Sequence, residues 1–148
     1  MRLVVQRVKN ASVTIDGELH SQINQGLLVL FGVSRDDTKS QADWLANKIS
    51  VLRCFEDENE KMNLSIKDVN GEMLIVSQFT LCGDVKKGTR PSFDNAMPPK
   101  EANEMYEYFI GKVKEQGVPV KTGVFGADMK VCLLNDGPVT FVVDAPQN

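Results

Sequence analysis

One stretch of the chain, residues 71–83, constrains the fold more than any other. It carries a glycine at each end and opens with an unbroken apolar run from Met73 to Val76. A short apolar run bounded by glycines predicts a strand that is buried on both faces. The run then changes abruptly to Ser77-Gln-Phe-Thr80. Polar groups at the end of a buried strand need hydrogen-bond partners. Either Ser77 and Thr80 cap the strand end by bonding to nearby backbone, or a substrate supplies the partners.

Length and composition predict one globular domain over residues 1–148. The chain is 42% hydrophobic and 25% charged, which is ordinary for a domain with its own core. The N-terminal stretch meets charge too early for a signal peptide, and no apolar run approaches the length of a membrane helix. The three cysteines, Cys54, Cys82 and Cys132, are odd in number and widely spaced, which fits reduced thiols. We therefore expect a cytoplasmic protein without a membrane partner.

The first third of the chain predicts strands. Residues 2–8 and 11–15 form two apolar stretches with Lys9-Asn10 between them, which predicts a hairpin turn. Asp16-Gly17 is a second turn signal, and we expect a short strand after it, through Leu19. Residues 26–33 are too apolar to be half exposed and predict a central strand.

Two helices are expected to pack on one side of these strands. The first follows the N-cap candidates of residues 34–38 and runs to about Cys54, and the second opens at Met97-Pro-Pro99 and ends at Gly117. The last third predicts strands at 129–134 and 139–143, with a sharp turn between them. The expected architecture is α+β, with two small, mainly antiparallel sheets and two helices on one side.

Familiar catalytic sets are missing from the sequence. The one histidine, His20, has no triad signature around it, and no cysteine or histidine grouping has metal-ligand spacing. The acidic run at residues 56–60 lacks the glycine and terminal glutamate of a calcium loop, so we interpret it as a solvated turn. We expect no metal and no cofactor. An enzyme built this way must work with backbone N–H groups, hydroxyls and groups of its substrate.

Two further segments have both a structural and a functional interpretation. Lys86, Lys87 and Arg90 form a tight cationic cluster in the loop that follows the polar strand end. Such a cluster is either simply solvated or contacts phosphates, and the net charge of −3 does not exclude recognition of a single RNA end. Gly137-Pro138 is either a plain turn or a cis dipeptide whose carbonyls form a rigid polar wall.

Taken together, Ser77-Gln-Phe-Thr-Leu81 and Asn135-Asp-Gly-Pro-Val-Thr140 closely resemble the two signature motifs of the D-aminoacyl-tRNA deacylases, also called D-tyrosyl-tRNA deacylases. The resemblance extends along the chain through Arg2-Leu-Val-Val-Gln-Arg-Val8, Lys87-Gly-Thr-Arg-Pro-Ser-Phe93 and Thr122-Gly-Val-Phe-Gly-Ala-Asp-Met129. It implies the family's fold and a homodimer that hydrolyses the ester between a D-amino acid and the 3′-terminal adenosine of tRNA. Glycyl-tRNA, including glycine mischarged on tRNA(Ala), would be accepted because glycine has no side chain to reject.

The resemblance also implies roles for individual residues. Gly137 and Pro138 of one subunit would enter the partner's pocket and reject L-amino acids by clash, above a floor formed by Ser77 to Thr80. Arg7 resembles the arginine that braces this dipeptide. The terminal adenine would be held by Phe125 and Met129, and acceptor-end phosphates by Lys86, Lys87 and Arg90.

The expected chemistry relies on the substrate. The N–H groups of Phe79 and Thr80 are candidates for stabilising the oxyanion, with Gln78 positioning the ester. Thr80 is the obvious protein nucleophile, but the sequence offers no adjacent base. We therefore favour a water positioned by the ribose 2′-hydroxyl, with Thr80 as a positioning group.

Two other functions are also compatible with the sequence. One is a non-catalytic module that binds RNA ends or adenine nucleotides and uses Ser77 and Thr80 only as ligand donors. The other is a relaxed relative with a trans Gly137–Pro138 bond, which would also admit small L-amino acids.

Overall fold

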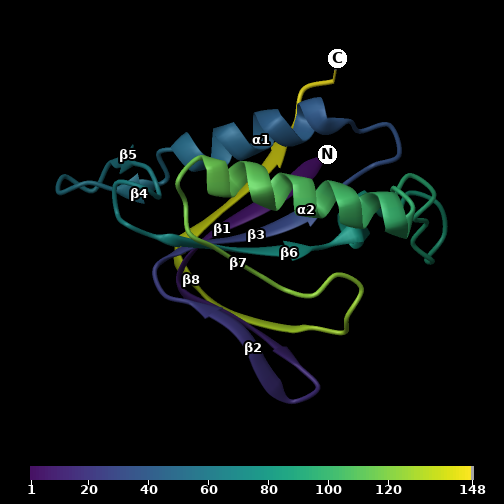
Figure 1. The fold of residues 1–148 in the computed structure, drawn as a ribbon, viewed down its shortest axis with the longest axis horizontal. Coiled ribbons are helices and arrows are strands. Elements are labelled where there is room, and N and C mark those ends of the chain that lie inside the picture. Colours follow the sequence, from purple (N-terminus) through teal and green to yellow (C-terminus); the bar gives the residue numbers. More distant parts are fainter. Residues whose placement is uncertain (148) are drawn as a thin grey trace.

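A computed structural model describes residues 1–147 and has two helices lying on one face of a six-stranded sheet, with a separate two-stranded hairpin beside them (Figure 1). The α+β class with both helices on one side is therefore confirmed. The large sheet has the order β2-β1-β3-β6-β7, and β8 also pairs with β1. Its strands are β1 (Arg2–Ile15), β2 (Glu18–Ile23), β3 (Gly26–Gly32), β6 (Glu72–Ser77), β7 (Val120–Thr122) and β8 (Lys130–Asp144). The hairpin consists of β4 (Phe55–Glu56) and β5 (Met62–Leu64). Pairing is antiparallel except at β3–β6 and β6–β7, which are parallel.

The hairpin turn predicted at Lys9-Asn10 is wrong, because residues 2–15 form one continuous strand. A hairpin would require the two halves of this stretch to pair with each other. Instead, residues 2–8 pair with β3, residues 11–15 pair with β2, and both halves pair with β8. Lys9 and Asn10 are exposed residues within the strand. Long-range pairing has overridden a local turn signal.

The predicted turn at residues 135–138 is likewise an irregularity within a strand. Gln6 pairs with Thr140 and Val8 pairs with Asn135, so residues 136–139 of β8 stand opposite the single residue Arg7. A strand with extra residues on one side must bulge out of the sheet. Gly137 and Pro138 form the crest of this bulge, and both are exposed.

The two helices begin and end at recognisable signals. Helix α1 (Lys39–Val51) starts after Thr38, whose N–H donates to the side-chain oxygen of Gln41 at 2.7 Å. It ends before the expected Cys54, because Leu52 already has an extended backbone. Helix α2 (Pro99–Glu115) opens at the predicted prolines. It stops just before Gly117, whose φ of 88° suits glycine.

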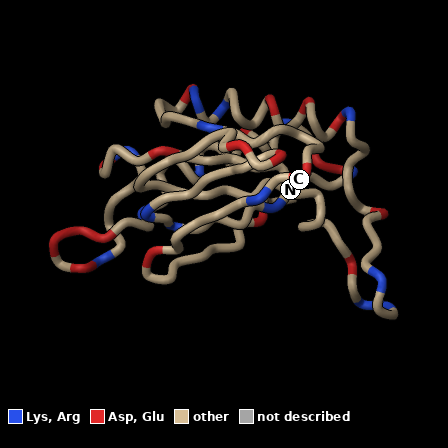
Figure 2. The backbone as a smooth tube through the Cα atoms, turned by 90° about the horizontal axis from the view of Figure 1, so that it is seen from below, with Lys and Arg blue, Asp and Glu red and all other residues tan. Residues whose placement is uncertain are grey.

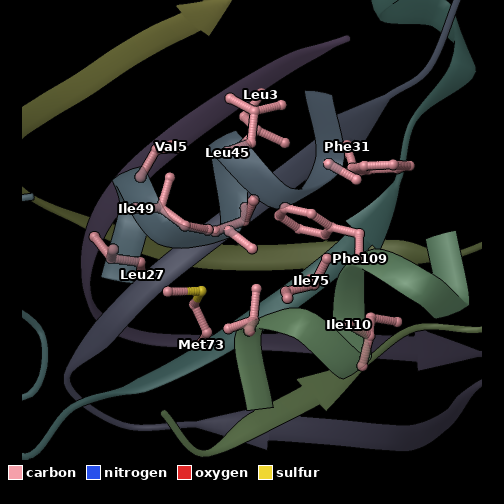
Figure 3. Packing of buried hydrophobic residues seen from close by; sticks show 14 of the residues in the cluster. Leu3, Val5, Leu27, Phe31, Leu45, Ile49, Met73, Ile75, Phe109 and Ile110 are labelled. Carbon is pink, nitrogen blue, oxygen red and sulfur yellow. The ribbon is translucent and has the colours of Figure 1, made fainter. Parts of the chain in front are cut away.

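Strand β6 is buried on both faces, as its apolar run predicts. Met73 and Ile75 belong to the main core between the sheet and the helices, with Phe31, Leu45 and Phe109 (Figure 3). Leu74 and Val76 alternate with them and belong to a second core on the other face of the sheet. Apolar packing on both faces fixes the backbone of β6, so the polar residues that follow it have a rigid base.

No helix among the described residues is long and apolar enough to cross a bilayer.

Candidate functional site

A cavity of about 660 Å³ opens at the carboxyl end of β6. Its walls come from the ends of β3 and β6, the turn before α2, the first turn of α2 and the segment 125–131. Most of the lining is apolar, with Ser77 and Gln78 among the polar groups. A mostly apolar hollow with a few convergent polar groups is typical of small-ligand sites, and this volume suits a molecule the size of an aminoacyl nucleoside.

The polar residues after β6 form a short 3₁₀ helix, η1 (Phe79–Cys82), at the edge of the cavity. The N–H of Gln78 donates to the carbonyl of Phe31 at 2.7 Å, which ties the strand end to β3. The N–H of Leu81 donates to the carbonyl of Gln78 at 3.2 Å and closes the first turn. The N–H groups of Phe79 and Thr80 precede that closure, so they have no acceptor within the turn. They are two adjacent donors at the end of a rigid strand.

Thr80 has a hydrogen-bonded hydroxyl but no base. The side-chain amide of Gln78 donates to Thr80 Oγ1, and an amide N–H₂ cannot take the threonine proton. Thr80 itself does not line the cavity, whereas Ser77, Gln78 and Phe79 do. Among the described lining residues the ionisable side chains are Arg35 and Asp128, and Asp128 is paired with Lys130 at 3.2 Å. The polar groups at the strand end itself are therefore backbone donors, hydroxyls and an amide, and none of these is a general base.

Phe125 and Met129 both line the cavity. The Phe125 ring lies 6.1 Å from the ring of Tyr106, measured between centroids. Tyr106 is buried, and its hydroxyl donates to the carbonyl of Ile75 at 2.6 Å. Burial raises the pKa of Tyr106, so the hydroxyl stays a donor over the whole physiological range. This buried tyrosine thus supports the aromatic wall on one side and the strand before Ser77 on the other.

Gly137, Pro138 and Arg7 do not line the cavity of the same chain. The Gly137–Pro138 bond is cis, and Gly137 has a φ of 128°. Arg7 is buried beneath the bulge; its Nε donates to the carbonyl of Asp136 at 3.1 Å, and Nη1 donates to the carbonyl of Cys54 at 2.9 Å. A third contact joins Nη2 to the carboxylate of Glu56 at 3.4 Å. The guanidinium therefore ties the bulge of β8 to the start of β4.

The basic cluster lies on a loop outside the cavity. Asp84 and Ser92 exchange backbone hydrogen bonds of 2.7 and 2.8 Å, which closes the neck of the loop. Lys86, Lys87 and Arg90 are all exposed within it. In Figure 2 this loop projects from the body, and the acidic hairpin of β4 and β5 projects at the opposite end. The basic loop and the acidic hairpin thus lie at opposite ends of the molecule.

Comparison with known proteins decides the family. The sequence model for D-Tyr-tRNA(Tyr) deacylase matches residues 4–144. The chain belongs to this family. A D-aminoacyl-tRNA deacylase from Geotalea uraniireducens (strain Rf4) is 57% identical over 148 residues, which cover 100% of this chain and 96% of that protein. One from Koribacter versatilis (strain Ellin345) is 59% identical over 145 residues, which cover 98% of this chain and 97% of that protein.

Two solved structures share the fold of this chain. The protein described as c-Myc DNA Unwinding Element Binding Protein superposes with a TM-score of 0.93 at 43% identity, covering 99% of this chain and 100% of that one. A probable eukaryotic D-amino acid tRNA deacylase superposes with a TM-score of 0.80 at 17% identity, covering 96% and 98%, and shows the shared fold alone. The predicted family membership is confirmed, and with it the prediction that the chain is a hydrolase of this family.

Sequence reasoning missed two residues that the deacylase structure brings to prominence. Asn135 lies in one of the two motifs, but the sequence did not indicate its structural role. Its Nδ2 donates to the carbonyls of Arg7 and Val139, each at 2.9 Å, and closes the base of the bulge. An asparagine next to Asp-Gly-Pro is a usable signal, since its side chain often bonds to nearby backbone. Arg35 lies on the cavity wall although it stood in a stretch interpreted only as a helix start. No pattern in the sequence marked it.

Proposed function

We propose that this protein hydrolyses the ester between a D-amino acid and the 3′-terminal adenosine of tRNA, releasing the free D-amino acid and tRNA. The observation that carries the proposal is a pair of adjacent backbone donors, Phe79 and Thr80, that have no acceptor within their turn, at the end of a buried strand beside a cavity of nucleoside size. The full-length relatives named D-aminoacyl-tRNA deacylase support the same substrate class. Such a substrate occurs in the cytoplasm, where we place the protein.

In the proposed reaction, water attacks the ester carbonyl while the ribose 2′-hydroxyl positions it and relays a proton to the departing 3′-oxygen. The carbonyl oxygen becomes an oxyanion, and the N–H groups of Phe79 and Thr80 stabilise it. Each such preorganised donor contributes about 2.7–4 kcal/mol to lowering the barrier. Collapse of the intermediate breaks the bond between the carbonyl carbon and the 3′-oxygen. Gln78 holds the Thr80 hydroxyl and orients the ester.

Selection for the D-configuration would come from a second copy of the chain. Gly137 and Pro138 are exposed on the bulge of β8 and do not line the cavity of their own chain, so the dipeptide is free to enter another. In a homodimer its carbonyls would stand where an L side chain projects, while a D side chain points away. Rejection by a rigid obstacle discriminates more sharply than a matched apolar pocket can. Glycine, lacking a side chain, would pass, so glycyl-tRNA is also a proposed substrate.

Phe125 and Met129 are the proposed contacts of the terminal adenine, through an aromatic face and a thioether. Lys86, Lys87 and Arg90 are the proposed contacts of acceptor-stem phosphates. The first set lies on the cavity wall, and the second lies on the loop that Asp84 and Ser92 close, after β6 and η1.

Replacing Gly123 by alanine is expected to raise KM for D-tyrosyl-tRNA about fivefold. A Cβ at Gly123 would overlap the Met129 sulfur, which is the flexible end of a side chain and can move aside. The fold would survive, but Met129 would leave its place against the adenine, at a cost of roughly 1 kcal/mol. Gly111→Ala is the matched control, because a Cβ there meets nothing within 4 Å. Steady-state kinetics measure KM, and a thermal melt of each variant checks that the fold is intact. An unchanged KM would show that Met129 does not contact the adenine.

The decisive test of the proposed function is turnover of D-tyrosyl-tRNA and L-tyrosyl-tRNA by catalytic amounts of protein. We expect many turnovers on the D-ester and a difference of at least about 10³-fold against the L-ester, since the polar wall repels rather than merely fits less well. L-alanyl-tRNA tests for a relaxed relative, which would hydrolyse it. Tight binding of tRNA without release of any D-amino acid would instead establish the non-catalytic module.

A further inference from the structure

The rim of the cavity is held by a pair of antiparallel segments, residues 33–35 and 94–97. The N–H of Arg35 donates to the carbonyl of Asn95 at 2.9 Å, and the N–H of Met97 donates to the carbonyl of Val33 at 3.0 Å. Ser34 and Ala96 form a β-bridge between these two bonds. The backbone of Arg35 is therefore fixed at the cavity mouth.

The side chain of Arg35 is oriented by this same pair of segments. Its Nε donates to the carbonyl of Asp94, while the residue as a whole stays exposed and lines the cavity. A guanidinium has five N–H donors in a planar fork. Among the described residues this fork makes no other hydrogen bond, and no carboxylate lies within ion-pairing distance of it. Its terminal nitrogens are thus free for a ligand.

Arg35 differs in this respect from the other charges near the site. Arg7 uses its guanidinium on Asp136, Cys54 and Glu56, beneath the bulge. Asp128, the other ionisable lining residue, is paired with Lys130. Arg35 is the cation on the described cavity wall. Its Nε is hydrogen-bonded to the Asp94 carbonyl, and its terminal nitrogens are available to a ligand.

We propose that Arg35 binds the phosphodiester that joins the terminal adenosine to the preceding nucleotide. This inference rests on the proposed function, because it presumes that an aminoacyl-adenosine fills the cavity. The rest of the RNA must then leave through the mouth, so its first phosphate lies at the rim. A planar fork matches phosphate geometry in two parallel hydrogen bonds, which a lysine cannot offer. Lys86, Lys87 and Arg90 lie farther along, outside the cavity lining, and are left for later phosphates.

The test compares two substrates that differ in this phosphate. D-Tyrosyl-tRNA has it, and 3′-O-(D-tyrosyl)adenosine lacks every phosphate. For Arg35→Ala we expect KM for the tRNA ester to rise about tenfold, because one charge-assisted contact with the phosphate is lost. The kcat/KM for the nucleoside ester should be unchanged, because that substrate has no phosphate. The slope of log KM against log salt concentration should fall by about one. Arg53→Ala removes another exposed arginine, two residues beyond the C-terminal end of α1, and should leave the kinetics on both substrates unchanged.

Arg35→Gln and Arg35→Lys separate phosphate binding from a structural brace. If Arg35 only supports the rim through Asp94, all three variants should lose activity equally on both substrates, and the inference falls. It also falls if the tRNA ester is turned over normally by Arg35→Ala and Arg35→Gln. With phosphate binding, Lys retains part of the tRNA affinity and Gln retains none, while the nucleoside ester reports intact chemistry in each. Hydrolysis of neither substrate by the wild-type protein would overturn the proposed function itself.

Discussion

D-Tyrosyl-tRNA ending in 2′-deoxyadenosine is expected to lose about 10³-fold in kcat with the wild-type protein. The size follows from general acid–base catalysis, which a positioned group typically contributes at 10²- to 10⁴-fold. The described strand end supplies no such group, since Ser77, Gln78 and Thr80 carry hydroxyls and an amide; the carboxylate of the described wall, Asp128, is an exposed residue paired with Lys130. The 2′-hydroxyl next to the ester is then the group that can position water and relay a proton. Single-turnover hydrolysis of matched ribose and deoxyribose substrates measures the effect.

Thr80→Ala is the companion experiment, with an expected loss in kcat of only about tenfold or less. The Gln78 amide donates to the threonine oxygen, so it positions this hydroxyl without activating it. Removing the hydroxyl leaves the Thr80 backbone N–H and hence the oxyanion donor in place. Thr80→Ser, which keeps the hydroxyl, should match the wild type. Complete loss in Thr80→Ala with substrate binding intact, together with full turnover of the deoxy substrate, would establish a threonine nucleophile in place of substrate assistance.

Elements of the fold that are determined by their own residues, rather than by distant partners, could be predicted from the sequence. The apolar run of Met73 to Val76 identified β6, and packing of alternate residues into two cores is the reason such a run has no polar face. The change at Ser77 located the site for the same reason, because a strand buried on both faces tolerates polar groups only where it leaves the core. Prolines and glycines at the ends of α2 fixed that helix through backbone conformation alone.

Elements set by distant partners could not be predicted in this way. Lys9-Asn10 has the composition of a turn, yet β8 pairs on both sides of it and keeps the strand continuous. The bulge at Gly137 exists because four residues of β8 stand opposite Arg7, a register that neither segment encodes separately. Arg35 was overlooked for a related reason: it reaches the cavity wall through backbone bonds to residues 94–97, some sixty positions along the chain.

Replacing Arg7 by alanine is expected to lower the free energy of unfolding by about 3–5 kcal/mol. Arg7 is only 5% exposed, and its guanidinium satisfies two backbone carbonyls and pairs with Glu56. Truncation leaves those acceptors without their donor and creates a cavity under the bulge. Removing one partner of a buried charged contact is strongly destabilising, because the groups that remain are buried and unpaired. Urea denaturation at a fixed protein concentration measures the loss, since assembly would make stability concentration-dependent.

Arg2→Ala is the matched control on the same strand. Arg2 pairs with Asp144 at 2.7 Å, but both side chains are about half exposed, so the expected loss is below about 1 kcal/mol. An equal effect of the two variants would mean that the Arg7 contacts contribute no more than a surface pair.

The same substitution should loosen the segment on which chiral selection is proposed to depend. Burial raises the pKa of the Cys54 thiol to about 11, so it is almost wholly protonated at pH 8 and slow to alkylate. Loss of the bond from Arg7 to the Cys54 carbonyl frees the start of β4, and labelling of this thiol should accelerate. If the dipeptide is the selective wall, discrimination between D- and L-tyrosyl-tRNA should also fall, because a wall that moves no longer rejects by clash. A destabilised Arg7→Ala protein with undiminished stereoselectivity would separate the brace from the selection and place the chiral filter elsewhere.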